Sequence, residues 1–343
     1  MESLVSIYTP RVMIEAMKQS QRPTTFLGDL LVKRRTPELS DLIEIDVETG
    51  GKKVSVYTTR TANPTEVGKL GYHTNIHNTP YISEEVTYTS RDTRDRLPGE
   101  NPYAGQNPRA RLDTKIANWL ADLQDRLIRR EEQQIAEAIQ TGKLVISAPG
   151  VNYTVDYQMN SSHIVVLTGS DLWSSTGDKI AQIEAWSALI RNSGAPAATD
   201  IIMGTSAAAA FLADSKVLDL YNKWNANFGS LVPQVIAGQG ATFLMTLRRI
   251  GVDVNIYVYQ AQYDDAGTIK SYIDPNKVVM LARSMRAEFH YGPIENLKHG
   301  TMVAANFPYI YEDETGKSGH VCLESAPLFG LHQPDAVVCA TVL

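Results

Sequence analysis

A long three-and-four repeat of apolar residues stands out in the hydrophobic pattern, between Pro108 and Gly142. Spacing of this kind places apolar side chains on one face of a helix. The members of the repeat are Leu112, Ile116, Trp119, Leu120, Leu123, Leu127, Ile135 and Ile139. The pattern predicts a helix over 109–141, with Pro108 before it and Gly142 closing it. At about 1.5 Å per residue this helix is about 50 Å long, which is more than a compact domain needs.

Residues 42–92 alternate between apolar and polar at both ends and are polar in the middle. Ile43, Ile45 and Val47 form one apolar row. The paired glycines in 48–52 favour a turn, because glycine accepts positive φ. We expect the strand to return over 54–58, and alternation resumes at 86–90. A lone hairpin of this length is marginally stable in water, so we expect it to lie on another surface.

The other elements are shorter, and the chain ends in an apolar run. Helices are predicted at 178–191, 205–214 and 217–224, and strands at 144–167, 200–204, 252–259, 269–273, 278–281, 303–311, 321–325 and 336–343. Most chain ends are polar and frayed, so residues 336–343 are expected to be buried in a sheet. Residues 1–40 look like an arm whose apolar residues around 26–32 lack an evident partner. Together these elements predict an α+β fold.

Composition argues against one class of function, extensive binding of nucleic acid. The 343 residues are 43% hydrophobic and 20% charged, with a net charge of −6. A negative chain does not attract the phosphate backbone. The two cysteines, Cys322 and Cys339, are expected to be buried free thiols in a reducing compartment. The first residues do not resemble a secretory signal, and the longest uncharged run is too polar for a membrane span.

The search for chemistry yields no catalytic, cofactor-binding or metal-binding residue that we would assign. His73 and His77 have the H-x-x-x-H spacing of a helical metal site, but they lie in a Pro/Gly/Asn-rich stretch and are better interpreted as loop histidines. Three further groups are better explained by structure than by chemistry. The charge run 91–96 is interpreted as a solvated or inter-subunit patch, and Gly238-Gln239-Gly240 as a turn. Asp264, Asp265 and Asp274 are interpreted as turn residues. No nucleophile, phosphate-loop or zinc motif occurs, which favours a structural protein.

The last seventy residues carry a specific likeness. The segments 274–296 and 324–343 resemble the closing region of lambda-type major capsid proteins, the phage major capsid protein E family. The features that carry the likeness are Asp274-Pro275, the strand 278–281, Tyr291-Gly292, residues 325–328 and Pro334-Asp335. Close likeness covers roughly a fifth of the chain, and the remainder agrees in length and order of elements.

The resemblance implies the Hong Kong 97-type capsid fold. Its parts would be an N-terminal arm over 1–41, an extended loop over 42–92, a peripheral domain over 93–169 that contains the long helix as a spine, an axial domain over 170–300, and a return of 301–343 to the peripheral sheet. The arm, the hairpin, the long helix and the chain end are all expected to be completed by neighbouring copies.

The implied function is that of a major capsid protein of a tailed bacteriophage, which is not an enzyme and uses no cofactor. Its copies would form the hexamers and pentamers of an icosahedral shell around double-stranded DNA. A separate scaffolding protein and a portal are the implied partners, with assembly in the host bacterial cytoplasm. Whether a decoration protein also binds is left open by the resemblance. Three alternatives stay open: an encapsulin-like compartment, a minor virion or connector subunit, and an unrelated α/β enzyme with a substrate domain in 171–224.

Overall fold

The computed structural model describes residues 9–19, 25–48, 55, 72–92, 94–95, 108–148, 150–219, 234–236, 239–249, 251–298 and 300–343. The helices include α2 (Pro10–Gln19), α3 (Phe26–Leu31), α4 (Pro108–Thr141), α5 (Lys179–Ser193) and α6 (Thr205–Leu212), with short 3-10 turns η1 (Ser161–His163), η2 (Gly169–Asp171) and η3 (Pro334–Ala336). Residues 215–219 are also helical, and the rest of the helix predicted over 217–224 lies outside the described residues.

The strands, in chain order, are β1 (Arg34–Pro37), β2 (Leu42–Glu48), β3 (Tyr72–Asn78), β4 (Ile82–Thr89), β5 (Lys143–Ala148), β6 (Val151–Asp156), β7 (Ile164–Val166), β8 (Asp200–Met203), β9 (Gln234–Ile236), β10 (Ala241–Arg249), β11 (Val252–Tyr259), β12 (Gln262–Asp265), β13 (Thr268–Ser271), β14 (Lys277–Leu281), β15 (Ala287–Tyr291), β16 (Ile294–Asn296), β17 (Gly300–Met302), β18 (Phe307–Glu312), β19 (Ser318–Ser325), β20 (Pro327–Leu331) and β21 (Val337–Thr341). The predicted α+β class is confirmed.

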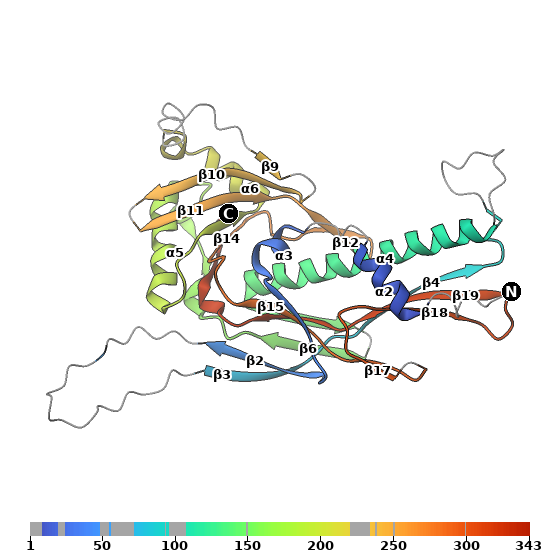
Figure 1. The fold of residues 1–343 in the computed structure, drawn as a ribbon. Coiled ribbons are helices and arrows are strands. Elements are labelled where there is room, and N and C mark those ends of the chain that lie inside the picture. The colour runs from blue at the N-terminus through green and yellow to red at the C-terminus, as the bar shows by residue number, and fades with distance from the viewer. Residues whose placement is uncertain are drawn as a thin grey trace, which may run out of the picture.

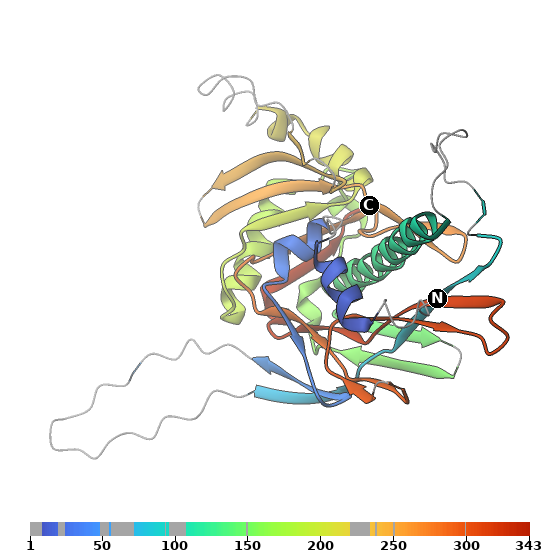
Figure 2. The ribbon, with the colours of Figure 1, turned by 45° about the vertical axis from the view of Figure 1, so that its right-hand side comes forward.

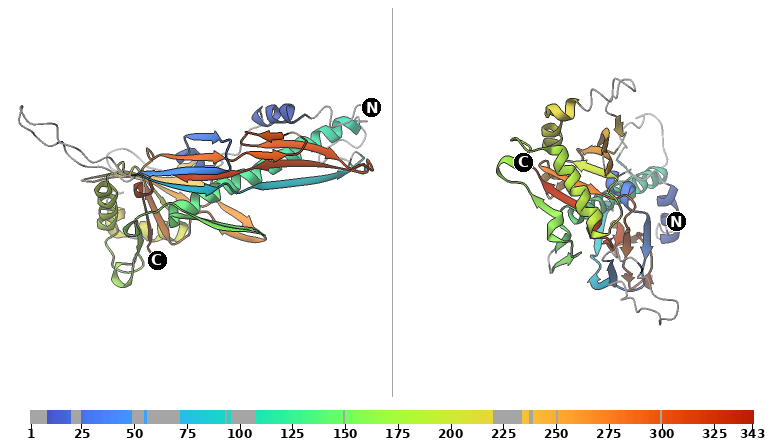
Figure 3. Two further views of the ribbon diagram at one scale, coloured as in Figure 1. Left: turned by 90° about the horizontal axis from the view of Figure 1, so that it is seen from below. Right: turned by 90° about the vertical axis from the view of Figure 1, so that its left-hand side faces the viewer.

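The molecule is elongated. The end that carries α5 and α6 lies opposite the end that carries the start of α4 and the strands β4, β18 and β19 (Figure 3). The long helix α4 runs between these two ends (Figure 1). It begins at Pro108, one residue before the predicted start, and it is 34 residues long. Gly142 follows it with a φ of 68°, a left-handed conformation that glycine adopts without strain.

Alternate sides of the largest sheet pack into two separate cores. Its seven strands have the order β7-β21-β14-β8-β11-β10-β9. Val279 and Leu281 of β14 belong to a core shared with α4, whereas Val278 and Met280 belong to a core shared with α5 and α6. Because both faces are covered at this point, β14 and its neighbours β8 and β21 are nearly continuous apolar runs.

The last strand shows the same division. Val337 and Cys339 enter the core beside α4, and Val338 and Ala340 enter the core beside α5. The return of 301–343 to the sheet of the peripheral domain stays a prediction. Strands β18 to β20 pack near α4, and β21 lies between β14 and β7 in the seven-stranded sheet. A strand that is apolar on both faces needs a sheet covered on both sides, which explains this choice.

The N-terminal segment also departs from expectation, because it is buried within its own chain. Phe26, Leu27 and Leu31 of α3 are at most 4% exposed and join the core beside α4. Glu132 of α4 accepts hydrogen bonds from the backbone N–H groups of Leu27, at 2.8 Å, and Gly28, at 2.9 Å. The arm was interpreted as unable to bury itself, but a buried carboxylate far along the sequence supplies its partner.

A second buried carboxylate holds the strand that follows. Glu131 of α4 forms an ion pair with Arg35 of β1 and accepts a hydrogen bond at 2.7 Å from the hydroxyl of Tyr291. Burial, and then the nearby Glu131 charge, raises the pKa of Tyr291, so its hydroxyl keeps its proton. Strand β1 pairs in parallel with β15, which carries Tyr291. Adjacent residues of α4 therefore fix both α3 and β1.

The hairpin has a different return strand from the one predicted. Strand β2 pairs antiparallel with β3, with Leu42 opposite Asn78 and Glu48 opposite Tyr72. The predicted return over 54–58, apart from residue 55, lies outside the described residues. Ile43 and Ile45 are 4% and 1% exposed and join the core beside α4. The base of the hairpin is thus anchored on its own subunit, as its place beside the body shows (Figure 2).

The Glu132 contacts generate a stability prediction. Glu132→Gln places an N–H donor where a carboxylate oxygen accepts, so one buried N–H loses its acceptor. We expect the free energy of unfolding in urea to fall by about 2 kcal/mol. Asp125→Asn, on an exposed part of the same helix and paired with Arg129 at 3.9 Å, removes the same charge and should change stability by less than about 0.5 kcal/mol. Equal losses in the two variants would contradict the assignment.

The same residue gives the stability difference a pH dependence. Burial raises the pKa of Glu132, although hydrogen bonds from Leu27, Tyr259 and Gly28 oppose it. The folded chain therefore holds this proton more tightly than the unfolded chain. The stability of the wild-type chain relative to Glu132→Gln should be greatest below the ordinary Glu pKa, and should decline as the pH rises through the raised pKa.

The cysteines yield a chemical prediction. Both Cys322 and Cys339 are free and buried, as predicted. Burial is the largest cause of the raised pKa in each, to about 12 for Cys322 and about 11 for Cys339. Because the thiolate is the reactive form, the native chain at pH 8 should not react with Ellman's reagent, and the urea-unfolded chain should release two equivalents. Rapid labelling of a native thiol would refute this.

Candidate functional site

The histidine pair singled out in the sequence lies on a strand. His73 and His77 both belong to β3, which corrects the loop interpretation. Residues four apart on a strand share a face but are about 13 Å apart along it. They therefore cannot ligate one ion together. Burial lowers the pKa of His77, which keeps its ring neutral.

The charge run after β4 is used within the chain. Asp92 accepts hydrogen bonds from the N–H and hydroxyl of Thr89, and its carbonyl accepts one from Lys115 of α4 at 2.6 Å. Arg94 offers its carbonyl to Arg111 at 3.1 Å. This segment thus caps a turn and ties it to the start of α4. Thr93 and Arg96 lie outside the described residues.

The remaining sequence candidates form turns. Gly240 has a φ of 63° at the start of β10, and its carbonyl accepts from the N–H of Gln260; Gly238 lies outside the described residues. Asp264 accepts from the N–H of Gly267, Asp265 pairs with Lys270, and Asp274 accepts from the N–H of Asn276. Each acidic side chain therefore has a turn-forming partner, as expected.

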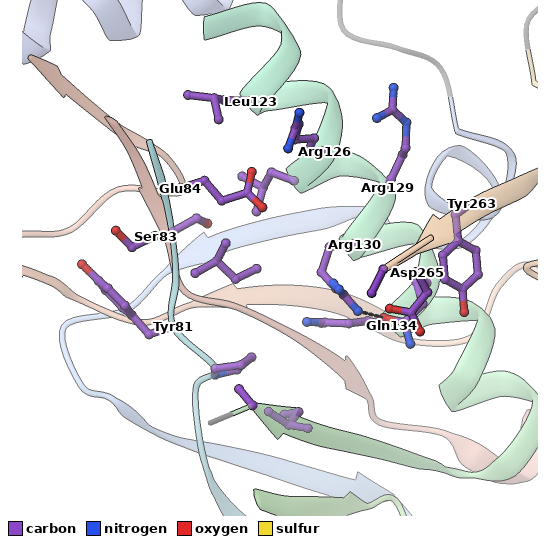
Figure 4. A pocket seen from close by; sticks show the side chains of 18 of the residues that line it. Tyr81, Ser83, Glu84, Leu123, Arg126, Arg129, Arg130, Gln134, Tyr263 and Asp265 are labelled. Carbon is purple, nitrogen blue, oxygen red and sulfur yellow. Dashed lines mark hydrogen bonds between the residues drawn. The ribbon is translucent and has the colours of Figure 1, made fainter. Parts of the chain in front are cut away.

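A cleft of about 880 Å³ lies beside the middle of α4. Figure 4 shows the arginines of α4 along one wall, Tyr81, Ser83 and Glu84 of the β4 segment opposite them, and Tyr263 with Asp265 at one end. Strand β5 and the turn between β12 and β13 complete the lining. Residues of β19 also line it, so five segments meet here. Three of them, the β4 segment, the β12–β13 turn and β19, lie far from α4 in the sequence, which is why no linear pattern revealed the cleft.

The cleft combines an apolar floor with charged walls. Leu123, Leu127 and Leu323 line it and are at most 4% exposed. Tyr81 and Val145, also in the lining, are 51% and 52% exposed. The charged members are Glu84, Asp122, Arg126, Arg129, Arg130, Asp264 and Asp265.

Several of these charges are already paired along the helix or in the turn. Arg126 contacts Asp122 at 3.2 Å, and Arg130 donates a hydrogen bond to Gln133. A hydrogen bond from Lys270 lowers the pKa of Asp265. A surface with exposed apolar groups and both signs of charge suits an extended polypeptide more than a small substrate.

One described group combines metal-binding side chains. Glu288 and His290 of β15 and His332, just after β20, offer ligand atoms that all lie within 4.8 Å of one another. All three residues are buried, at 5%, 8% and 2% exposure. No linear motif marks this group, because His332 lies 42 positions after His290 and only the β15–β20 pairing brings them together.

No described helix combines the length and apolar character needed to cross a membrane.

Comparison with known proteins agrees with this architecture. The family model described as phage major capsid protein E matches residues 9–342. The chain is 22% identical to the major capsid protein of Escherichia phage lambda, covering 97% of this chain and 98% of that protein. It is 21% identical to the major capsid protein of Escherichia phage N15, with the same coverage.

Solved structures show the fold. The putative capsid protein of a prophage of E. coli CFT073 matches with a TM-score of 0.74, at 17% identity, over 98% of this chain and 99% of that chain. The Hong Kong 97-type capsid fold expected from the sequence is confirmed. The likeness noted in the last seventy residues extends over nearly the full length, and the chain therefore belongs to the phage major capsid protein E family.

Proposed function

We propose that copies of this chain polymerise into the closed icosahedral shell of a tailed-phage virion, around double-stranded DNA. The observation that carries the proposal is the family match over residues 9–342. Membership in a capsid protein family implies a structural, non-enzymatic role. The same match favours a phage shell over an enzyme-filled compartment, a connector subunit or an α/β enzyme.

Each part of the capsid fold is assigned to a stretch of this chain. We keep 1–41 as arm, 42–92 as extended loop, 93–169 as peripheral domain and 170–300 as axial domain. The final segment 301–343 is then shared, with β18 to β20 beside α4 and β21 in the seven-stranded sheet. Hexamers and pentamers would form through the axial region, and a scaffolding protein, a portal and a decoration protein would act on the assembled copies in the host cytoplasm.

The contact between copies is proposed to run through the hairpin and the cleft. Residues 49–71, apart from Ser55, lie outside the described residues. Their sequence carries Val54, Val56 and Tyr57, and the lysines Lys52, Lys53 and Lys69. Apolar side chains of this loop would cover Tyr81 and Val145 of a neighbour, while its lysines would approach Glu84 and Asp122. Each contact is weak, and many simultaneous contacts stabilise the closed shell.

The loop can be removed without disturbing its base. Because Glu48 pairs with Tyr72, replacing 49–71 with an Asn-Gly turn closes β2 and β3 directly. This variant should keep its cooperative thermal unfolding but form no closed shells in negative-stain electron microscopy, with or without a scaffold. A Gly/Ser loop of the original length separates lost contacts from lost length, and it should also fail. Normal shells from both variants would refute the proposed contact.

The cleft can be tested from the other side. Val145→Asp puts a charge where the neighbour's apolar loop would lie, and should reduce shell yield at least tenfold with little change in the melting temperature. Val151 of the paired strand β6 is 45% exposed and does not line the cleft. Val151→Asp is therefore the matched control and should assemble. Equal yields from the two variants would place the contact elsewhere.

A further inference from the structure

In both His290 and His332, the ring nitrogen Nδ1 lies near a hydrogen-bond acceptor. Nδ1 of His332 lies 2.9 Å from the carbonyl oxygen of Asp46 in β2. Nδ1 of His290 lies 3.4 Å from a carboxylate oxygen of Glu38, the residue after β1. Since a carbonyl or carboxylate only accepts, each Nδ1 must carry the proton. In a neutral ring, Nε2 is then the lone-pair nitrogen.

Both Nε2 atoms are buried and lack a hydrogen-bond partner. They converge on one carboxylate oxygen: Glu288 Oε1 is 3.0 Å from Nε2 of His332 and 3.9 Å from Nε2 of His290. The shorter contact does not have hydrogen-bond geometry. Two lone pairs and a carboxylate that face one another call for a cation.

The surroundings leave room for the rings. Gly330 lies opposite Glu288 in the β15–β20 ladder. A Cβ at Gly330 would lie 3.1 Å from Cδ2 and 3.2 Å from Nε2 of His290, which is tighter than ordinary van der Waals contact. Glycine at this position therefore lets the ring turn its Nε2 toward the carboxylate.

Arg286 is the competing cation. Its Nη2 lies 3.2 Å from Glu288 Oε1, and its side chain is 52% exposed. An exposed guanidinium can move toward solvent, and the carboxylate has a second oxygen that can keep the contact. The arginine therefore balances part of the Glu288 charge.

We propose that Glu288, His290 and His332 bind one divalent transition-metal ion of the zinc type, with water completing the coordination. Two imidazoles and one carboxylate form a ligand set that Zn²⁺ accepts. Bonds of about 2.0–2.1 Å require ligand atoms about 3.3 Å apart, and the observed 3.0 and 3.9 Å bracket this value. Metal-bound histidines usually donate their other ring N–H to a carbonyl or carboxylate oxygen. The Nδ1 groups of His332 and His290 do so toward Asp46 and Glu38.

The ion would fasten the base of the hairpin. Through His332 it reaches the backbone of β2, through His290 it reaches the end of β1, and both ligand strands belong to the sheet β1-β15-β20. Metal binding would therefore stiffen the segment from which the extended loop departs. This inference concerns the isolated subunit and does not depend on shell assembly.

The test uses the full-length subunit, stripped with EDTA and dialysed. Titration with ZnCl₂ in a calorimeter should show one ion per chain with micromolar or tighter affinity, and the melting temperature should rise on saturation. His290→Gln and His332→Gln should each weaken binding at least tenfold. The matched control is the double variant His73→Gln/His77→Gln, which removes the other histidine pair and should bind as the wild-type chain does.

A measurement on the unaltered chain guards against variants that fail to fold. X-ray absorption at the zinc edge should report two imidazoles in the first shell, and Co²⁺ should give visible d–d bands of a four-coordinate site. Absence of saturable stoichiometric binding to the wild-type chain overturns the proposal. So does a zinc spectrum without imidazole, or a loss of binding in the His73/His77 variant alone.

Discussion

The long helix α4 joins elements from both ends of the chain, because α3, β4, β19, β20 and β21 all pack against it. A 34-residue helix is too long for one small core, and it is buried by three. Its first turns pack with Met13, Tyr88 and Val321, its middle with Met17 and Leu323, and its last turns with the seven-stranded sheet. Each core supplies apolar burial at about 25 cal/mol per Å². Because α4 contributes residues to all three cores, it couples them, and we expect the elongated molecule to unfold cooperatively.

Two adjacent carboxylates add direction to this packing. Apolar contact alone would let the N-terminal segment slide along α4, because it is nondirectional. Glu131 and Glu132 face a guanidinium, two backbone N–H groups and two tyrosine hydroxyls. A buried carboxylate is tolerated only with such partners. The pair therefore sets the register of α3 and β1, and through β1 it positions the sheet that carries Glu288 and His290.

Sequence reasoning succeeded where periodicity is long and failed where partners are distant. The repeat in 109–141 located α4 to within one residue, and the apolar run at the chain end correctly predicted a buried strand. The strand's neighbours could not be predicted, because both faces are apolar and no face distinguishes one sheet from another. The arm was misjudged because Glu132, more than a hundred residues away, satisfies its backbone. Strand β3, which pairs with β2, was not predicted because it is polar, with Tyr72, His73, Asn75 and His77 among its residues.

The pairing of β2 with β3 has a geometric consequence for any shell. Residues 49–71 leave and re-enter the subunit at a single point, the Glu48–Tyr72 pair. Half of this 23-residue segment, at about 3.4 Å per residue, spans at most about 40 Å. The tip can therefore touch only what lies inside a sphere of that radius centred on the pair. The curvature of a shell would move neighbouring subunits into or out of this sphere. It would therefore set the number of neighbours that the loop of each subunit can contact.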